Sequence, residues 1–183
     1  MCCNTWKIQK KLTSLVAYGY LNTINSGKKW DKYVFKGRYD HTVDLKGRAS
    51  LPSRFRENIA GLHDDRVILT FALDAEYPHL DVFPYTAWRE FEQKLAQKPI
   101  FDPSVTMLKR LYVADAVECQ IDSHGRILIP QFHRARAEIV KEVVWLGMNR
   151  IMEIWEPRRW QAAQDEASGR IQDVRRELAG FDL

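Results

Sequence analysis

Two short stretches of this 183-residue sequence place the same reactive side chains at the same spacing. One is DLKGRASLP, which begins at Asp44, and the other is DSHGRILIP, which begins at Asp122. In both, an arginine directly follows a glycine. Arginine binds phosphate groups and reads base edges through paired N–H donors. The pattern therefore predicts a turn that occurs twice and presents an arginine for contact with phosphate or with a groove edge.

A second interpretation of the motif needs no ligand. In the first stretch Asp44 could pair with Arg48 across a surface turn, and the second stretch offers the equivalent pair. Exposed ion pairs of this kind are common and contribute little to stability. The motif alone leaves both interpretations open.

Local charge favours nucleic acid at the first turn. Residues 35–56 hold six basic and two acidic side chains, a net of +4, whereas residues 115–136 balance to zero. The net charge of the whole chain says little, because residues 1–33 alone contribute +5. A solvated charged face is the alternative. We predict contacts with double-stranded DNA, made by Lys36, Arg38, Lys46, Arg48, Arg54 and, in the second turn, Arg126.

The two stretches belong to an internal duplication. Residues with turn or strand-ending roles recur at an offset of 78, namely Asp44, Gly47 and Pro52 as Asp122, Gly125 and Pro130. The segments VFPYTAW (82–88) and IWEPRRW (154–160) then correspond at an offset of 72. Two anchor points in the same order indicate a duplicated unit.

Each copy predicts the same order of elements. Alternation with period two predicts a strand, the glycine a tight turn, and the proline the end of a second strand. A short helix, a further strand pair and a helix that starts at a tryptophan follow. In the first copy these elements lie at 37–44, 48–52, 53–59, 66–73, 80–84 and 88–98. In the second copy they lie at 115–122, 126–130, 131–139, 142–148, 150–155 and 160–178. Residues 102–113 predict a joining helix with Asp102 as its N-cap.

The fold class predicted from these elements is α+β. Neither copy has enough strands to close a core alone, so we expect the two to pack as a pseudo-twofold barrel with flanking helices. The predicted divisions are a first repeat with its helix at 35–98, a connecting helix at 99–112, and a second repeat with the C-terminal helix at 113–183. Residues 1–33 have no repeat partner, and we expect them to be a disordered or non-native tail.

Enzyme chemistry is not indicated. The five histidines are scattered without the spacing of metal ligands, and P-loop, G-x-G-x-x-G and G-x-S-x-G motifs are absent from the sequence. Cys119 alternates with Val117 and Ile121 and is predicted to be a core residue. We therefore predict no catalytic site, metal, cofactor or small-molecule ligand. The segment 12–24 is too short and interrupted to span a bilayer, which favours a cytoplasmic protein.

The segments FKGRYDHTVDLKGRASLP and ECQIDSHGRILIP, with the tryptophan-led helices, resemble the MraZ family of bacterial transcriptional regulators. The resemblance runs from about Phe35 to the C terminus. It implies two AbrB-like swapped-hairpin units and a ring-shaped homo-oligomer at the nucleoid. It also implies binding to short direct repeats of DNA upstream of the division and cell-wall gene cluster, usually as a repressor, with Arg48 as the DNA-binding arginine.

Two questions stay open at the level of sequence. His124 stands in the second turn where the first has Lys46, so the second copy either contacts DNA or only completes the fold. The alternative function is a non-catalytic ring-forming interaction module or an antitoxin-like protein of the same fold. The position of the positive charge, around one hairpin, favours DNA over a scaffold.

Overall fold

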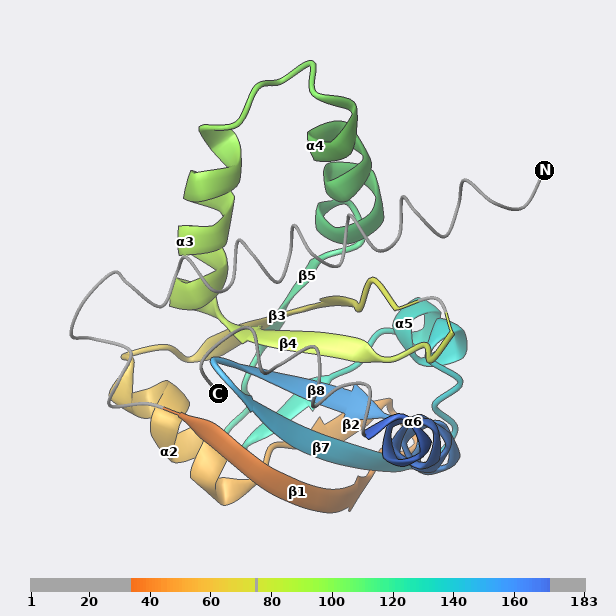
Figure 1. Ribbon diagram of the computed structural model, residues 1–183. Helices are drawn as coiled ribbons and strands as arrows, with labels where there is room; N and C mark the ends of the chain where they lie inside the picture. Colours follow the sequence, from red (N-terminus) through yellow and green to blue (C-terminus); the bar gives the residue numbers. More distant parts are fainter. Residues whose placement is uncertain (1–33, 75, 172–183) are drawn as a thin grey trace.

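Residues 34–74 and 76–171 are described by the computed structural model, in which eight strands form two antiparallel sheets (Figure 1). The first copy supplies β1 (Phe35–Thr42), β2 (Arg48–Ser50), β3 (Arg66–Phe71) and β4 (Leu80–Pro84). The second copy supplies β5 (Val117–Gln120), β6 (Arg126–Leu128), β7 (Glu142–Asn149) and β8 (Ile151–Trp155). Six strands follow the order β1-β7-β8-β4-β3-β5, and β2 pairs with β6 in a separate ribbon.

The strand order is unchanged when the two copies are exchanged. β1 pairs with β7 of the second copy, and β5 pairs with β3 of the first. Each copy thus gives its first hairpin to the other. The strands β4 and β8 meet in the middle of the sheet, where Asp81 is paired with Glu153. These two residues also correspond at the 72-residue offset, so the pseudo-twofold axis passes through this pair.

The α+β class is confirmed, but a closed barrel is not. Among the described residues no pairing joins the edge strands β1 and β5, so the six-stranded sheet is open. An isolated bridge between Val43 and Ala49 links the ribbon to the end of β1. The strands β2 and β6 are three residues long and pair with each other, so they do not extend the ladder at either edge.

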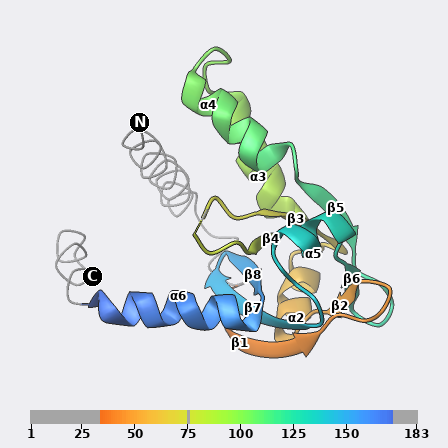
Figure 2. The ribbon, with the colours of Figure 1, turned by 90° about the vertical axis from the view of Figure 1, so that its right-hand side faces the viewer.

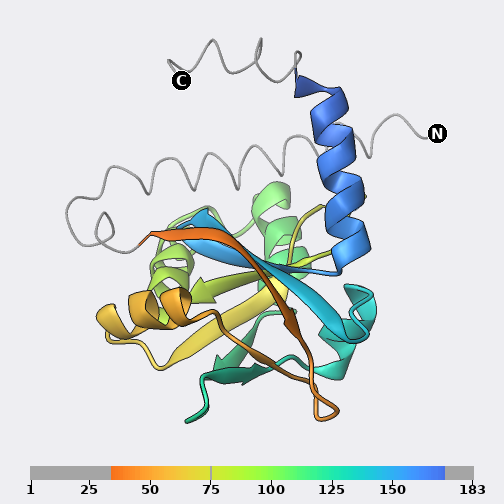
Figure 3. The same cartoon turned by 90° about the horizontal axis from the view of Figure 1, so that it is seen from below.

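The ribbon covers one face of the sheet and encloses the main core. Its residues Ala49 and Ile127 are fully buried. The helix α2 (Ser53–Gly61) contributes Phe55, whose ring meets Trp145 edge-on at 6.5 Å. The helix α5 (Gln131–Arg136) lies on the opposite side of the molecule from α2 (Figure 3). Cys119 is buried here as predicted, and burial raises the pKa of its thiol to about 11.

The other face of the sheet carries the longer helices. The helix α3 (Tyr85–Ala96), the short α4 (Pro103–Leu108) and a π-helical turn η1 (Lys109–Val113) form an arm that projects from the sheet (Figure 1). Their cluster contains Phe83, Trp88 and Tyr112. The helix α6 (Pro157–Gly169) packs on a second cluster around Trp155. Two helical clusters therefore flank the middle of this face.

Both long helices begin three residues before the tryptophan predicted to start them. The carboxylate of Asp64, 22 residues away, accepts hydrogen bonds from the backbone N–H and hydroxyl of Thr86 at 3.0 and 2.7 Å. That cap cannot be recognised from local sequence. Glu156 caps α6 by accepting from the N–H of Arg159 at 2.9 Å.

The predicted tail at 1–33 and the predicted helix beyond residue 171 lie outside the described residues, and the repeat boundaries stay a prediction.

Candidate nucleic-acid interface

The ribbon of β2 and β6 carries one motif turn at each end, on the side of the molecule away from α6 (Figure 2). Antiparallel pairing sets Arg48 opposite Leu128 and Arg126 opposite Ser50. Because the side chains of a strand alternate, Ala49 and Ile127 point into the core while both arginines point outward. We call the turns and ribbon (residues 44–50 and 122–128), together with Arg54, Arg56 and Arg134, the paired-turn surface.

In the first turn, Asp44 shapes the backbone and also binds the arginine. Its Oδ1 accepts from the backbone N–H groups of Lys46 and Arg48 at 2.9 and 3.0 Å. Its Oδ2 accepts from Nε and Nη2 of Arg48 at 2.8 and 2.7 Å. Gly47 has a φ of +83°, a conformation that other residues rarely adopt. The hydrogen bonds from the Arg48 side chain lower the pKa of Asp44 to about 2.

The second turn repeats this geometry. Asp122 Oδ1 accepts from the N–H groups of His124 and Arg126, both at 2.9 Å. Its Oδ2 accepts from Nε and Nη2 of Arg126 at 2.9 and 2.7 Å, and these bonds lower the pKa of Asp122 to about 2. Both ion pairs of the ligand-free interpretation therefore form. That interpretation and DNA contact are compatible, because each arginine keeps donors that its carboxylate does not use.

The free donors of Arg48 are held in a fixed place. A guanidinium carries five N–H donors, and Asp44 occupies one on Nε and one on Nη2. The side chain of Arg48 is 31% exposed, and that of Arg126 is 25% exposed. A guanidinium oriented in advance loses less conformational freedom when it binds a ligand. The remaining N–H groups suit a pair of acceptors such as O6 and N7 of guanine.

Contacts between the copies join the two turns into one surface. Arg126 Nη1 lies 3.9 Å from Oδ2 of Asp44. Arg56 of α2 lies against Gly125, where an added Cβ would come within 2.2 Å of its Nη1. Arg134 of α5 lies against Gly47 in the same way, at 3.0 Å. Each turn is thus covered by an arginine from the other copy.

The surface has a clear excess of positive charge. Six basic side chains stand against Asp44 and Asp122, a formal net of +4. Within the described part of the chain four of the six make no ion pair, namely Lys46, Arg54, Arg56 and Arg134. Such cations are available for phosphate groups. Sequence reasoning did not select Arg56 and Arg134 as site residues, although they too are related by the 78-residue offset.

The structure separates two predicted DNA-binding residues from the others. Lys46, Arg48, Arg54 and Arg126 come together on the paired-turn surface. Lys36 and Arg38 lie on β1, with Lys36 up to ~25 Å along the strand from Asp44. The Nη2 atom of Arg38 is 3.2 Å from Asp40. These two side chains do not belong to the same surface.

The prolines of both motifs stand between a strand and a helix. Pro52 precedes α2 and Pro130 precedes α5, and each accepts a hydrogen bond from the first turn of its helix at 2.9 and 3.0 Å. They end the ribbon strands, which is the role the sequence predicted. The helices that carry Arg56 and Arg134 therefore start at the ribbon.

A family model described as "MraZ protein, putative antitoxin-like" matches the chain twice, at residues 34–111 and 112–179. The chain belongs to the MraZ family. It is 36% identical to the transcriptional regulator MraZ of Pediococcus pentosaceus over 82% of this chain and 100% of that protein. The MraZ regulators of Caldanaerobacter subterraneus and Moorella thermoacetica are 33% and 35% identical, with the same coverage.

These findings confirm the predicted class. The chain's relatives in the MraZ family are named transcriptional regulators, so a DNA-binding regulator is supported and an enzyme is not. Among the helices that the structure describes, none has the length and apolar character needed to cross a membrane.

Proposed function

We propose that this MraZ-family chain regulates transcription by inserting its paired-turn surface into the major groove of promoter DNA. The observation that carries the proposal is the pair of arginines, Arg48 and Arg126, oriented by carboxylates on one exposed ribbon. The major groove is about 12 Å wide and admits a two-stranded ribbon. The cations around the ribbon that make no ion pair with the described residues supply contacts with the phosphates on either side.

The two arginines and the surrounding cations have different roles. Arg48 and Arg126 read base edges, because Asp44 and Asp122 fix their orientation and reduce their net charge. Lys46 and Arg54 are exposed and bind phosphate without regard to sequence. Lys36 and Arg38 contribute weak contacts at most, since they lie along β1. In this account both copies contact DNA.

We propose further that the chain assembles into a ring that binds several short direct repeats together. The arm ends in exposed apolar residues, Ile100 and Phe101, which are 71% and 95% exposed. It lies away from the ribbon, so contacts through it leave the paired-turn surface open (Figure 2). Contacts between different surfaces form a ring when the rotation from subunit to subunit closes, and several linked sites bind more tightly than one. The expected target lies upstream of the division and cell-wall genes, with repression in the cytoplasm at the nucleoid.

The alternative is an antitoxin-like or scaffolding protein that uses the same fold to bind another protein. The charge of the paired-turn surface favours DNA, because a protein contact has no need for four cations around one ribbon that make no ion pair with the described residues. A mobility-shift assay with the DNA upstream of this protein's own gene separates the two. Regulation predicts retarded bands that scrambled competitor does not remove. An interaction module predicts either no retarded band or a band that specific and scrambled competitor DNA remove equally well.

A further inference from the structure

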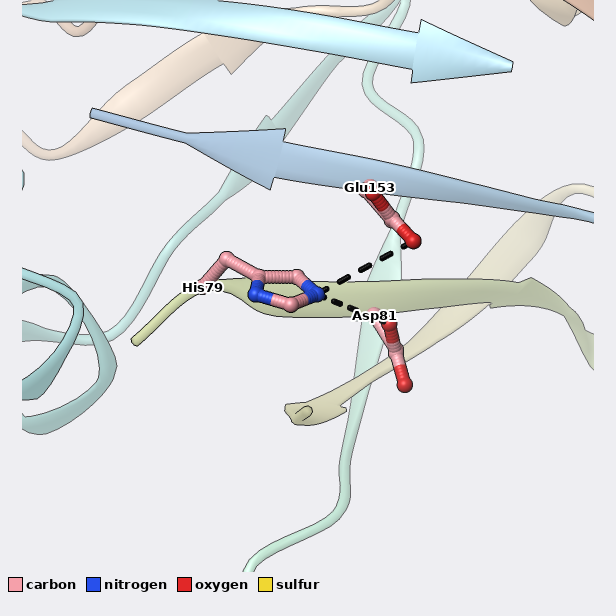
Figure 4. A group of neighbouring side chains, drawn as sticks. All are labelled: His79, Asp81 and Glu153. Atoms are coloured by element: carbon pink, nitrogen blue, oxygen red, sulfur yellow. Dashed lines mark ion pairs between the residues drawn. The ribbon is translucent and has the colours of Figure 1, made fainter. Parts of the chain in front are cut away.

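A buried polar group occupies the middle of the sheet face that carries the helices. It consists of His79 and Asp81 on the first copy and Glu153 on the second (Figure 4). Asp81 and Glu153 are the cross-strand pair of β4 and β8 on the pseudo-twofold axis. The three side chains are 8%, 11% and 12% exposed. They lie between the cluster of the arm and the cluster beneath α6.

An aromatic side chain from each helical cluster orients one of the carboxylates. The hydroxyl of Tyr112 donates to Asp81 Oδ2 at 2.5 Å, and the indole Nε1 of Trp155 donates to Glu153 Oε2 at 2.8 Å. The other oxygen of each group is turned toward the imidazole. Asp81 Oδ1 lies 3.8 Å and Glu153 Oε1 lies 3.9 Å from Nε2 of His79.

The backbone determines which nitrogen of His79 carries the proton. Its Nδ1 lies 2.7 Å from the carbonyl oxygen of Tyr77, and a carbonyl only accepts, so Nδ1 is the donor. In a neutral ring Nε2 then presents a lone pair to two carboxylate oxygens. Three acceptors converge in a buried space, and the described residues place no donor among them. Buried charges need a compensating partner, which is either a proton or a metal cation.

A proton on Nε2 fits the distances poorly. An imidazolium would draw a carboxylate to a hydrogen-bond length of about 2.7–3.2 Å, whereas both gaps are well beyond that. A metal ion bound between Nε2 and the carboxylate oxygens would keep these atoms farther apart than a hydrogen bond does. Bonds of about 2.0–2.2 Å in a tetrahedral site place ligand atoms ~3.4 Å apart. The three ligand atoms lie within 4.8 Å of one another, so small side-chain rotations would close the site.

We propose that Nε2 of His79, Oδ1 of Asp81 and Oε1 of Glu153 bind a divalent transition-metal ion of the zinc class. One imidazole and two carboxylates form a ligand set that zinc accepts, with water at the fourth position. The carbonyl of Tyr77 and the aromatic donors supply the outer hydrogen bonds that orient metal ligands. The ion would connect β4 of one copy to β8 of the other and stabilise their junction.

The site exists on one side of the pseudo-twofold axis only. The residue that corresponds to His79 at the 72-residue offset is Ile151, so the second copy supplies no equivalent imidazole. His79 also lines a surface pocket with Asp74, Pro78 and Arg136, whereas Asp81 and Glu153 are not part of its lining. The spacing of histidines in the sequence predicted no metal site, because Glu153 is distant in sequence and the fold brings it close.

The test is zinc binding by the full chain after treatment with a chelator, measured by equilibrium dialysis and elemental analysis. The variants are His79→Gln and Glu153→Gln, and the control is Glu142→Gln, an exposed carboxylate on β7. We expect wild type and control to hold one more Zn²⁺ per chain than either site variant, whose affinity falls at least ~10–100-fold. Zinc should also raise the Tm of wild type more than that of the variants.

Equal zinc binding by wild type and both site variants would overturn the proposal. If circular dichroism shows that the variants do not fold, the visible spectrum of Co²⁺ added to the wild-type chain decides. Absorption bands of four-coordinate Co²⁺, without charge-transfer bands from a cysteine thiolate, support the proposal. The spectrum of the hydrated ion, or thiolate bands from the cysteines, contradicts it.

Discussion

Nη1 of Arg126 lies 3.9 Å from Oδ2 of Asp44, so the motif arginine of one copy approaches the motif carboxylate of the other. This contact shows why counting charge along the sequence gave an incomplete result. The second copy is neutral over residues 115–136, yet its Arg126 and Arg134 lie on the same surface as the first turn. The two turns share one electrostatic environment.

The motif glycines should be intolerant of a side chain. Gly47→Ala and Gly125→Ala impose a positive φ on alanine, which costs about 1 kcal/mol. Gly125→Ala also has to displace Arg56, and Gly47→Ala crowds Arg134. Both variants should therefore unfold at lower denaturant concentration and bind DNA more weakly. Gly169→Ala is the matched control, since outside its own helix backbone and chain neighbours no atom of the described residues lies within 4 Å of the added Cβ. Equal stability of all three variants would contradict the account.

Acid should remove a defined part of the stability. The pKa values of Asp44 and Asp122 are lowered to about 2 by their arginines, while an unfolded aspartate titrates near about 3.9. A lowered pKa gives stability that is present above pH ~4 and is lost as the pH falls toward ~2. The Tm of Asp44→Asn/Asp122→Asn should lie below that of wild type at neutral pH. The difference between the two Tm values should become smaller as the pH falls from ~4 to ~2. A gap that is constant with pH would exclude these ion pairs as its cause.

Residues 1–33 should be dispensable for the fold and for specific binding. The family match begins at residue 34, and Phe35 is buried in the main core. Asn58 Nδ2 donates to the carbonyl of Val34 at 3.0 Å, a contact that a chain starting at Val34 retains. Its Tm should equal that of the full chain. Its affinity for non-specific DNA should fall, since a net charge of +5 is removed. Loss of the thermal transition would show that the segment is part of the core.

Assembly should depend on the tip of the arm. Light scattering of wild type should give a mass of several chains, and Ile100→Ser/Phe101→Ser should lower that mass because it removes exposed apolar area. Val140→Ser, at a residue 86% exposed on the turn after α5, is the control and should assemble normally. A wild-type monomer would refute the ring. An unchanged mass in the double variant would place the interface elsewhere.

Repetition and local pattern were sufficient to predict much of the fold. The 78-residue offset predicted both turns, and alternation with period two predicted the strands on either side of them. The sequence predicted a barrel, whereas the six-stranded sheet is open. This difference arises because β2 and β6 are too short to extend the sheet beyond its edge strands. The cap that Asp64 provides to α3 and the contact of Arg56 with Gly125 join residues distant in sequence. The cap lies within one copy, whereas the contact of Arg56 with Gly125 forms because the two copies exchange hairpins.

The affinity of the full chain for the DNA upstream of its own gene, measured by fluorescence anisotropy, tests whether Arg48 and Arg126 read promoter DNA. Arg48→Ala should bind about 10–100-fold more weakly than wild type, in line with ~1–3 kcal/mol for a paired base contact. Arg126→Ala should show a smaller defect, since its side chain is less exposed than that of Arg48. The control is Arg89→Ala, an exposed arginine on α3 paired with Glu92, and it should bind as wild type does. If Arg48→Ala binds normally but melts at lower temperature, the repeated motif serves only the turns, and the DNA-binding surface lies elsewhere.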